Sequence, residues 1–231
     1  MISIIIPLYN QAKLVGRCLE SILAQTYQPQ EVVVVNDGSE DNPQVVLNKF
    51  KPRFKEAGIR FEVINQANKG AAAARNRGAK NAGGKYLLFV DADIVLKPEM
   101  LAKMKAVLDK HSQISYVYSA HKFGFKKFKC LTFSASRLKQ MPYIHTTSLL
   151  RREHFPGFDE SLKRLQDWDL WLTMLEQGRR GMGIDEVLFT VKPGGTMSSW
   201  LPSFAYRFLP FLPQVKKYKQ AIEIIKKKHK I

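Results

Sequence analysis

The sequence contains few cysteines and no long hydrophobic run. Its two cysteines, Cys18 and Cys130, lie far apart and show no CxxC or Cys/His spacing, so we expect neither a disulfide framework nor a zinc site. No stretch approaches the roughly 18 consecutive apolar residues that a membrane-spanning helix needs. The first seven residues lack a basic leader and predict a strand rather than a secretory signal. These absences favour a globular protein of the reducing cytoplasm.

Acidic residues are scarce in the second half of the chain. The 231 residues include 37 Lys and Arg against 20 Asp and Glu, which gives a formal net charge of +17. Residues 1–100 carry 13 basic and 10 acidic side chains (+3), whereas residues 101–231 carry 24 and 10 (+14). Most of the excess lies in Lys122–Lys139 and Arg207–Lys230. Such a one-sided excess indicates an anionic partner, which could be lipid headgroups, nucleic acid or a phosphorylated substrate.

Short apolar runs alternate with helical patterns over residues 1–120. Strands are expected at Ile2–Pro7, Glu31–Asn36, Arg60–Ile64, Tyr86–Val90 and Ser115–Ala120. Helices are expected between them, at about 12–25, 43–54, 69–82 and 98–111. The four consecutive valines at 32–35 indicate a strand that is buried on both faces, as in parallel sheets. The alternation therefore predicts βαβ units and an α/β fold, with a mostly parallel sheet flanked by helices.

Polar residues follow four of these predicted strands. They are Tyr9 and Asn10, then Asp37–Ser39, Gln66–Lys69 and Asp91–Asp93. In a parallel sheet, ligands bind beyond the carboxyl ends of the strands, where these loops would meet. We therefore expect a binding site at that edge.

The second half of the chain has a less regular pattern. We expect a flexible basic lobe or loop at Lys122–Lys139, strands at Tyr143–Leu150 and Val187–Val191, and an amphipathic helix at Asp167–Gln177. Residues 200–213 are rich in aromatic residues and proline, and residues 214–231 have the pattern of a basic amphipathic helix.

Six short motifs stand in register along roughly residues 1–195. They are Ser3–Asn10, Glu31–Ser39, Asn68–Asn76, Asp91–Asp93, Gly157–Glu160 and Gln166–Leu170. In this order and spacing they resemble the family 2 glycosyltransferases, which have the Rossmann-like GT-A fold. The resemblance implies an inverting enzyme that moves a sugar from a nucleotide-diphospho-sugar, expected to be a UDP-sugar. The acceptor would be a hydroxyl of a glycan or a lipid-linked molecule in cell-envelope or polysaccharide biosynthesis, with a polyprenyl phosphate as the alternative.

The resemblance also implies how the chain is divided. Residues 1–199 would form the GT-A domain, with a nucleotide-sugar-binding half at 1–120 and an acceptor-binding half at 121–199. Residues 200–231 would be a basic, aromatic C-terminal extension. Because aromatic side chains favour a bilayer interface and cations favour anionic lipids, this tail is expected to dock the enzyme peripherally at the inner face of the membrane. The alternative is a solvated helix that covers the core.

The diphosphate of such a donor must be neutralised, both to bind and to leave. The resemblance implies that Asp93 is a ligand of a divalent cation, Mn²⁺ or Mg²⁺, which would act as a Lewis acid on the leaving group. It implies that Asp91 contacts the ribose or the water shell of the cation. It also implies donor contacts, to the base or the phosphates, from Pro7, Tyr9, Asp37, Lys69 and Arg75.

The acceptor hydroxyl needs a base, and Asp167 matches the position of the catalytic base of the family. Asp169, two residues later, would point in a different direction and is the weaker candidate. Two positions depart from the family pattern. Gln166 stands where the family usually has an acid, and Lys192 is the only charged residue where relatives often carry a His or Arg that clamps the metal or the diphosphate.

Each of these residues also has a structural interpretation. Asp37 could cap a turn, Asp91 and Asp93 could cap the helix after Pro98, and Asp167 could cap the Trp-rich helix. Arg75 could be a solvated charge on a helix. The five histidines show no HxH or HExxH spacing, so they are expected to be structural or on the surface.

Two other classes of function remain open at this stage. The basic composition could belong to a non-catalytic nucleic-acid-binding protein, but that class explains none of the acidic motif residues, so we expect no nucleic-acid partner. The chain could also be a catalytically inactive sensor of sugar nucleotides.

Overall fold

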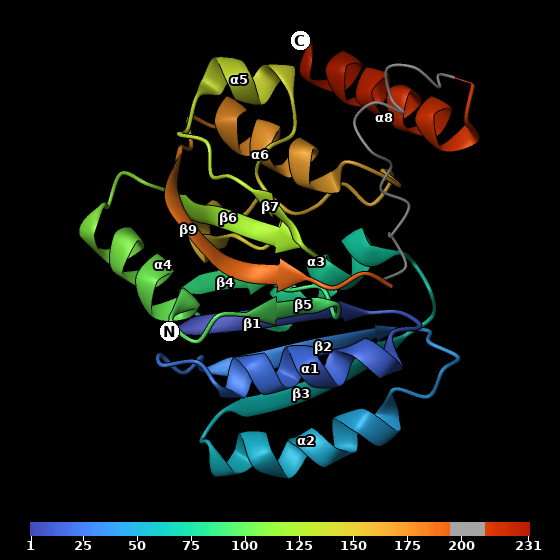
Figure 1. Cartoon of the computed structure of the whole chain (residues 1–231), viewed down its shortest axis with the longest axis vertical. Helices are drawn as coiled ribbons and strands as arrows, with labels where there is room; N and C mark the ends of the chain where they lie inside the picture. Colours follow the sequence, from blue (N-terminus) through green and yellow to red (C-terminus); the bar gives the residue numbers. More distant parts are fainter. Residues whose placement is uncertain (195–210) are drawn as a thin grey trace.

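A single sheet runs through the computed structural model, which describes residues 1–194 and 211–231 (Figure 1). Its strands are β1 (Ile2–Leu8), β2 (Glu31–Asp37), β3 (Arg60–Gln66), β4 (Tyr86–Phe89), β5 (Ile94–Leu96), β6 (Tyr116–Phe123), β7 (Lys126–Phe128), β8 (Leu149–Arg151) and β9 (Gly181–Val191). The strand order is β3-β2-β1-β4-β8-β6-β9-β5, and β7 pairs with β6. The helices are α1 (Ala12–Leu23), α2 (Gln44–Glu56), α3 (Ala71–Asn81), α4 (Met100–Lys110), α5 (Ala135–Gln140), α6 (Gln166–Glu176) and α8 (Pro213–His229), with a 3₁₀ turn η1 at Arg152–His154.

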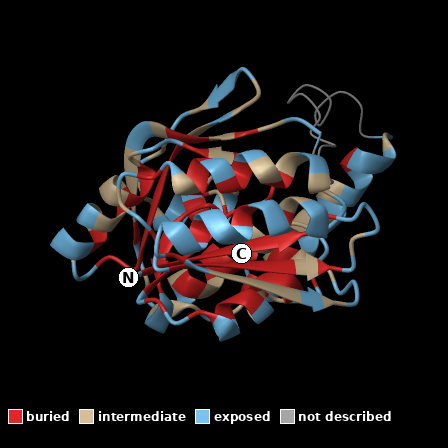
Figure 2. Ribbon diagram, turned by 90° about the horizontal axis from the view of Figure 1, so that it is seen from below, coloured by how far each residue is buried: buried red, intermediate tan, exposed pale blue. Residues whose placement is uncertain are grey.

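The first four strands form the parallel part of the sheet, as the sequence predicts. β1 pairs in parallel with both β2 and β4, and β2 pairs in parallel with β3. Alternate residues of β1 face opposite sides, as the period of a strand requires: Ile4 packs in the core with α1, whereas Ile5 packs in the core with α3. Figure 2 shows the buried sheet between helices whose outer faces are exposed. The mixed α/β fold with a mostly parallel sheet is therefore confirmed.

The second half extends this sheet with antiparallel strands. β8 lies antiparallel between β4 and β6, and β9 runs parallel to β6 and antiparallel to β5. Several sequence expectations were wrong here. The predicted strand Tyr143–Leu150 is only the short β8, the late strand begins at Gly181 rather than Val187, and β5 was not expected. The basic stretch Lys122–Lys139 is not a loop, because it contains the end of β6, all of β7 and most of α5.

The C-terminal helix α8 packs against α6 (Figure 1). Its apolar side, which includes Val215 and Ile225, is buried, and most of its lysines are exposed. The side of α8 that carries Ile222 and Ile225 therefore covers part of the core, as in the alternative interpretation of this segment. The predictions for residues 200–210, and for 195–198 near Lys192, fall outside the described residues. Within the described part of the chain, no helix is long and apolar enough to cross a membrane.

Candidate active site

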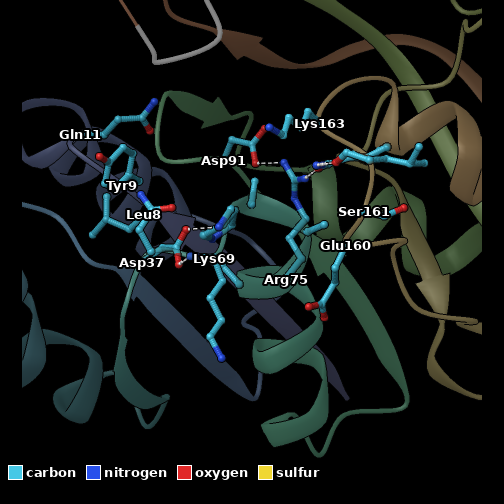
Figure 3. Close-up of a pocket in the computed structure, with 18 of the residues that line it drawn as sticks. Leu8, Tyr9, Gln11, Asp37, Lys69, Arg75, Asp91, Glu160, Ser161 and Lys163 are labelled. Atoms are coloured by element: carbon cyan, nitrogen blue, oxygen red, sulfur yellow. Dashed lines mark hydrogen bonds and ion pairs between the residues drawn. The ribbon is translucent and has the colours of Figure 1, made fainter. Parts of the chain in front are cut away.

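A cavity of about 520 Å³ lies at the edge of the sheet where β1, β2 and β4 end (Figure 3). Seven of the eight predicted site residues line it: Pro7, Tyr9, Asp37, Lys69, Arg75, Asp91 and Asp93. Its far wall comes from the loop before α6 and includes Glu160, Ser161, Leu162, Lys163 and Gln166. The predicted convergence of four strand-end loops is therefore correct. Asp167, the eighth residue, adjoins the cavity through its neighbour Gln166.

Asp37 fixes the loop that leads into α3. It is 2% exposed and accepts hydrogen bonds from the backbone N–H groups of Lys69 and Gly70, both at 2.8 Å. A third bond comes from Gln66 Nε2, also at 2.8 Å. These contacts join the ends of β2 and β3 to the start of α3. Asp37 does not cap its own turn, where Asn36 Oδ1 accepts the N–H of Ser39 at 3.1 Å. Its carboxylate instead holds the loop before α3, and it also lines the cavity.

The side chain of Lys69 is exposed and extends away from Asp91 and Arg75 (Figure 3). Its contribution to the described site is the backbone N–H that binds Asp37. Tyr9, in contrast, stands beside Leu8 and Asp37 at the rim, with 38% of its surface exposed. An exposed aromatic ring at the mouth of a polar cavity provides a surface on which a planar base can stack.

Arg75 is buried in the wall of the cavity, so it is not a solvated helix charge. Its Nη2 forms an ion pair with Asp91 Oδ1 at 2.6 Å, and its Nη1 donates to Gln166 Oε1 at 2.9 Å. The guanidinium carbon also lies 5.4 Å from the centre of the Phe158 ring. Arg75 thus links α3, the loop after β4 and the start of α6, and its buried Nε has no hydrogen-bond partner among the described residues.

Asp91 and Asp93 differ in their electrostatic surroundings. Burial opposes the charge of Asp91, but the Arg75 guanidinium outweighs it and holds the pKa of that carboxyl below its usual range. Burial and then the nearby charge of Asp91 raise the pKa of Asp93 to about 7. Neither carboxylate caps α4, whose first turn has no side-chain cap. The pair therefore concentrates negative charge in the cavity, with a single basic side chain, Arg75, bonded to it in the described structure.

No cluster of three or more His, Cys, Asp or Glu able to hold a metal occurs within residues 1–194 and 211–231. The carboxylates of Asp91 and Asp93 are nevertheless hard oxygen donors of the kind that Mg²⁺ and Mn²⁺ prefer. Magnesium is commonly held by only one or two carboxylates, with substrate phosphates and water as its other ligands. The residues present fit a cation that binds together with a diphosphate.

Asp167, the candidate general base, lies in the first turn of α6. Its Oδ1 accepts the backbone N–H of Trp168 at 2.9 Å, so it does satisfy a free donor at the helix start. Burial raises the pKa of Asp167, and the adjacent His145 opposes that rise. Such a carboxylate holds a proton more readily than an ordinary aspartate, which suits a general base.

His145 lies near the acids of the site but was not predicted as a site residue. Burial lowers the pKa of its imidazole, and the negative charges of Asp91 and Asp167 partly oppose this shift. His145 therefore interacts electrostatically with both carboxylates. Its Nδ1 accepts the N–H of Thr147 at 3.0 Å, which leaves Nε2 as the nitrogen that bears the proton in the neutral ring. No sequence motif includes this residue, because only the tertiary fold brings it close to Asp91 and Asp167.

The two departures from the motif pattern have distinct structural roles. Gln166 accepts from Arg75 and donates through Nε2 to the carbonyl of Leu162 at 2.7 Å, so both ends of its amide are used. The backbone N–H of Lys192 donates to the carbonyl of Asp93 at 2.8 Å. This bond holds the end of β9 against the acidic pair.

Asp169 does not point into the cavity but binds the C-terminal helix. It is 2% exposed and receives His229 Nε2 at 2.8 Å and Lys228 Nζ at 2.7 Å. The same lysine reaches Asp159 at 2.7 Å. Two motif acids are therefore held by the last turn of α8, and we call Asp159, Asp169, Lys228 and His229 the α8 latch.

Such a sheet, with a strand-end cavity that carries paired carboxylates, belongs to the nucleotide-sugar transferase class of α/β folds. The family model for glycosyl transferase family 2 matches residues 3–161, and the chain belongs to this family. Putative glycosyltransferase EpsE of Bacillus subtilis is 28% identical over 204 residues, covering 83% of this chain and 72% of EpsE. Glycosyltransferase GlyG of Streptococcus pneumoniae is 40% identical over 102 residues, covering 44% of this chain and 33% of GlyG.

Solved structures share the fold. The TarS fragment 1–349 of S. aureus, in complex with UDP-GlcNAc, aligns with a TM-score of 0.72 and 24% identity over 91% of this chain and 64% of that chain. Mannosyltransferase PcManGT of Pyrobaculum calidifontis, in complex with GDP-Man and Mn²⁺, aligns with a TM-score of 0.68 and 19% identity over 85% of this chain and 58% of that chain. The predicted GT-A fold is confirmed. The chain spans less than two thirds of each of these two structures.

Proposed function

We propose that the chain is an inverting glycosyltransferase that moves a sugar from a UDP-sugar to a hydroxyl of a glycan or lipid-linked acceptor, in cell-envelope or polysaccharide biosynthesis. The observation that carries this proposal is the single cavity shared by Asp37, Arg75, Asp91 and Asp93. The UDP-GlcNAc complex of TarS supports the choice of UDP. A polyprenyl phosphate stays the alternative acceptor.

The donor would span the cavity from Tyr9 to Asp93. The base would stack on Tyr9 beside Pro7, with its ring edge directed to Asp37. Because the backbone donors of Lys69 and Gly70 already bind Asp37, its carboxylate is held in one orientation before the donor arrives. The role of Lys69 in this proposal is therefore carried by its backbone.

Asp93 would hold the divalent cation, Mn²⁺ or Mg²⁺, and Asp91 would contact the ribose or the water shell of that cation. A bound cation would supply Lewis-acid stabilisation of the negative charge that develops on the diphosphate as it leaves the sugar. Arg75 would keep Asp91 ionised and fixed in direction, since its guanidinium already pairs with that carboxylate. The Mn²⁺ complex of PcManGT supports this assignment.

Asp167 would act as the general base. Its carboxylate would take the proton of the acceptor hydroxyl while that oxygen attacks the anomeric carbon of the donor sugar. The bond from this carbon to the diphosphate oxygen breaks in the same step, and the nucleotide diphosphate leaves with the electron pair. Attack from the opposite side inverts the anomeric centre. His145 would stabilise the ionised base electrostatically, since its imidazole favours the charged form of Asp167.

A thermal-shift screen of nucleotide-sugars with Mn²⁺ tests this proposal. We expect a UDP-sugar to raise the melting temperature with Mn²⁺ and not with EDTA. Asp93→Asn should abolish the Mn²⁺-dependent shift, whereas the matched variant Asp185→Asn, at an exposed position outside the cavity, should retain it. A shift that persists in Asp93→Asn would contradict the metal assignment.

Two other classes of function predict different results. A nucleic-acid-binding protein would respond mainly to salt rather than to EDTA, because its binding depends on released counterions. An inactive sensor would show the same donor-induced shift without hydrolysing or transferring the sugar.

The membrane and domain assignments extend the proposal. Residues 1–199 would form the catalytic domain, with the donor bound by 1–120 and the acceptor by 121–199. The enzyme would work at the inner face of the membrane as a peripheral protein. Of the proposed 200–231 dock, α8 offers only its lysine-rich face, because its apolar side packs on α6.

A further inference from the structure

The turn between β6 and β7 presents a bare aromatic ring. Gly124 and Phe125 form a two-residue hairpin turn between the paired residues Phe123 and Lys126. Gly124 has a φ of 56°. The first position of such a turn needs a positive φ, which glycine adopts without strain. Phe125 at the tip is fully exposed, and it is the most exposed of the large hydrophobic residues that the structure describes. The short paired hairpin thus holds an apolar side chain out from the surface.

Positive charge surrounds this ring. The hairpin and the residue after it carry four lysines: Lys122, Lys126, Lys127 and Lys129. No Asp or Glu occurs between Asp109 and Glu153, a stretch with nine Lys and Arg. Asp185 is an acidic residue near the hairpin, and it lines a separate cavity together with Cys130. Because Cys130 follows the end of β7, this cavity lies at the base of the hairpin and not at its tip. The tip therefore combines an exposed aromatic ring with cations, the composition that favours an anionic bilayer interface.

The hairpin also lies next to the candidate active site. The N–H of Gly124 donates to the carbonyl of Val191 at 3.1 Å, and the next residue, Lys192, donates to the carbonyl of Asp93 at 2.8 Å. The end of β9 thus touches the hairpin turn and the acidic pair in two consecutive residues. A surface that holds the tip would lie beside the cavity.

We propose that the tip of the β6–β7 hairpin docks the protein on an anionic lipid bilayer, with Phe125 in the interface and the hairpin lysines at the lipid headgroups. A soluble polyanion would account for the lysines but gives the exposed ring no role. This proposal deepens the proposed function, since docking here would present a lipid-linked acceptor to the cavity. The docking itself needs no donor, so it can be tested separately.

Co-sedimentation of the full chain with vesicles tests the dock. We expect binding to phosphatidylcholine vesicles with 30% phosphatidylglycerol at low salt, and little binding to pure phosphatidylcholine. Lys127→Gln with Lys129→Gln should weaken binding about 25-fold, since each lysine near an anionic leaflet contributes about fivefold. The matched pair Lys49→Gln with Lys51→Gln, exposed on α2, should change binding less than about twofold.

Phe125 is tested in two ways. Phe125→Ser should weaken vesicle binding, whereas Val45→Ser, an exposed apolar position on α2, should not. Phe125→Trp should gain a fluorescence signal that moves to shorter wavelength with vesicles and is quenched by brominated lipid. In all variants the UDP-induced thermal shift should stay unchanged, which separates a failed dock from a failed donor site.

Three results would overturn the proposal. In the first, the hairpin variants bind vesicles with the affinity of the parent, and binding is lost instead in the α8 double variant Lys216→Gln with Lys217→Gln. The parent could bind neutral and anionic vesicles equally, or neither. It could also bind only soluble dextran sulfate with the same sensitivity to the hairpin variants, which would assign the surface to an anionic polymer.

Discussion

Asp167 combines a place in the first turn of α6 with a raised pKa, and both bear on its proposed role as the general base. Asp167→Asn should retain the donor-induced thermal shift and reduce kcat by about 10²–10⁴-fold, the usual contribution of a general base. A general base must be deprotonated to act, and burial raises the pKa of Asp167. As the pH is lowered, turnover of the parent should therefore be lost at a higher pH than with an ordinary aspartate as the base. Release of UDP measured from pH 4 to 8 checks this prediction. Asp185→Asn is the control, and unchanged turnover in Asp167→Asn would remove the residue from its role.

Gln166 shows how a neutral residue can be required where an acid would be expected. Gln166→Glu would replace the N–H donor to Leu162 with an oxygen that faces the carbonyl. A second carboxylate would also compete with Asp91 for Arg75. We expect the free energy of unfolding to fall by about 1 kcal/mol, the lower end of the cost of an unpaired polar group, because Gln166 is only partly buried. Gln113→Glu, at an exposed position, should change it by less than about 0.5 kcal/mol in urea titrations.

At the scale of elements, the α8 latch holds the last helix against α6. Hydrogen bonds from Lys228 and Ser161 lower the pKa of Asp159 to about 2. A lowered folded-state pKa adds stability above the unfolded value of about 4, and this stability is lost as the pH falls toward 2. The pair is partly exposed to solvent, which limits its contribution to about 1 kcal/mol.

Lys228→Met should therefore cost about 1 kcal/mol at pH 6 and much less at pH 2, where Asp159 is half protonated in the parent. Urea unfolding at the two pH values measures the difference. Lys227→Met, at the exposed neighbouring position on α8, should show no such dependence. Equal losses at both pH values would show that Lys228 acts through Asp169 or through packing rather than through Asp159.

Elements with strong local patterns could be predicted, and those fixed by tertiary contacts could not. The valines of β2 form a fully buried run and identified their strand, and Trp168 and Trp171 marked α6. In contrast, the first half of β9, Gly181–Asp185, has two glycines and few β-branched residues, and it is a strand because it pairs with β6. Loops that follow parallel strands meet by topology, so most of the cavity was predictable, whereas His145 reaches the acids only through packing.

For the molecule as a whole, the two proposed halves of residues 1–199 share one core. Leu149 and Phe189 pack in the same cluster as β1 and α1. The guanidinium of Arg151 donates to the carbonyls of Leu108, at 2.6 Å, and Ile114, at 2.8 Å, near the end of α4. The donor-binding half therefore depends on later segments for its buried contacts.

We expect residues 1–120 expressed alone not to fold cooperatively, because they lack β8, which pairs with β4, and Arg151, which binds the carbonyls near the end of α4. Near-UV circular dichroism and urea titration check this, with the full chain as the reference. A sharp transition and a native-like aromatic spectrum for the fragment would show that the halves are independent.

The end of β9 connects two places on the molecule through adjacent peptide groups. A ligand that moved this strand at the hairpin turn would also move the backbone that supports Asp93. Thermodynamic linkage makes any such influence mutual: if vesicles tighten Mn²⁺ binding by some factor, Mn²⁺ must tighten vesicle binding by the same factor. A loaded enzyme would then stay longer on the lipid surface than an empty one.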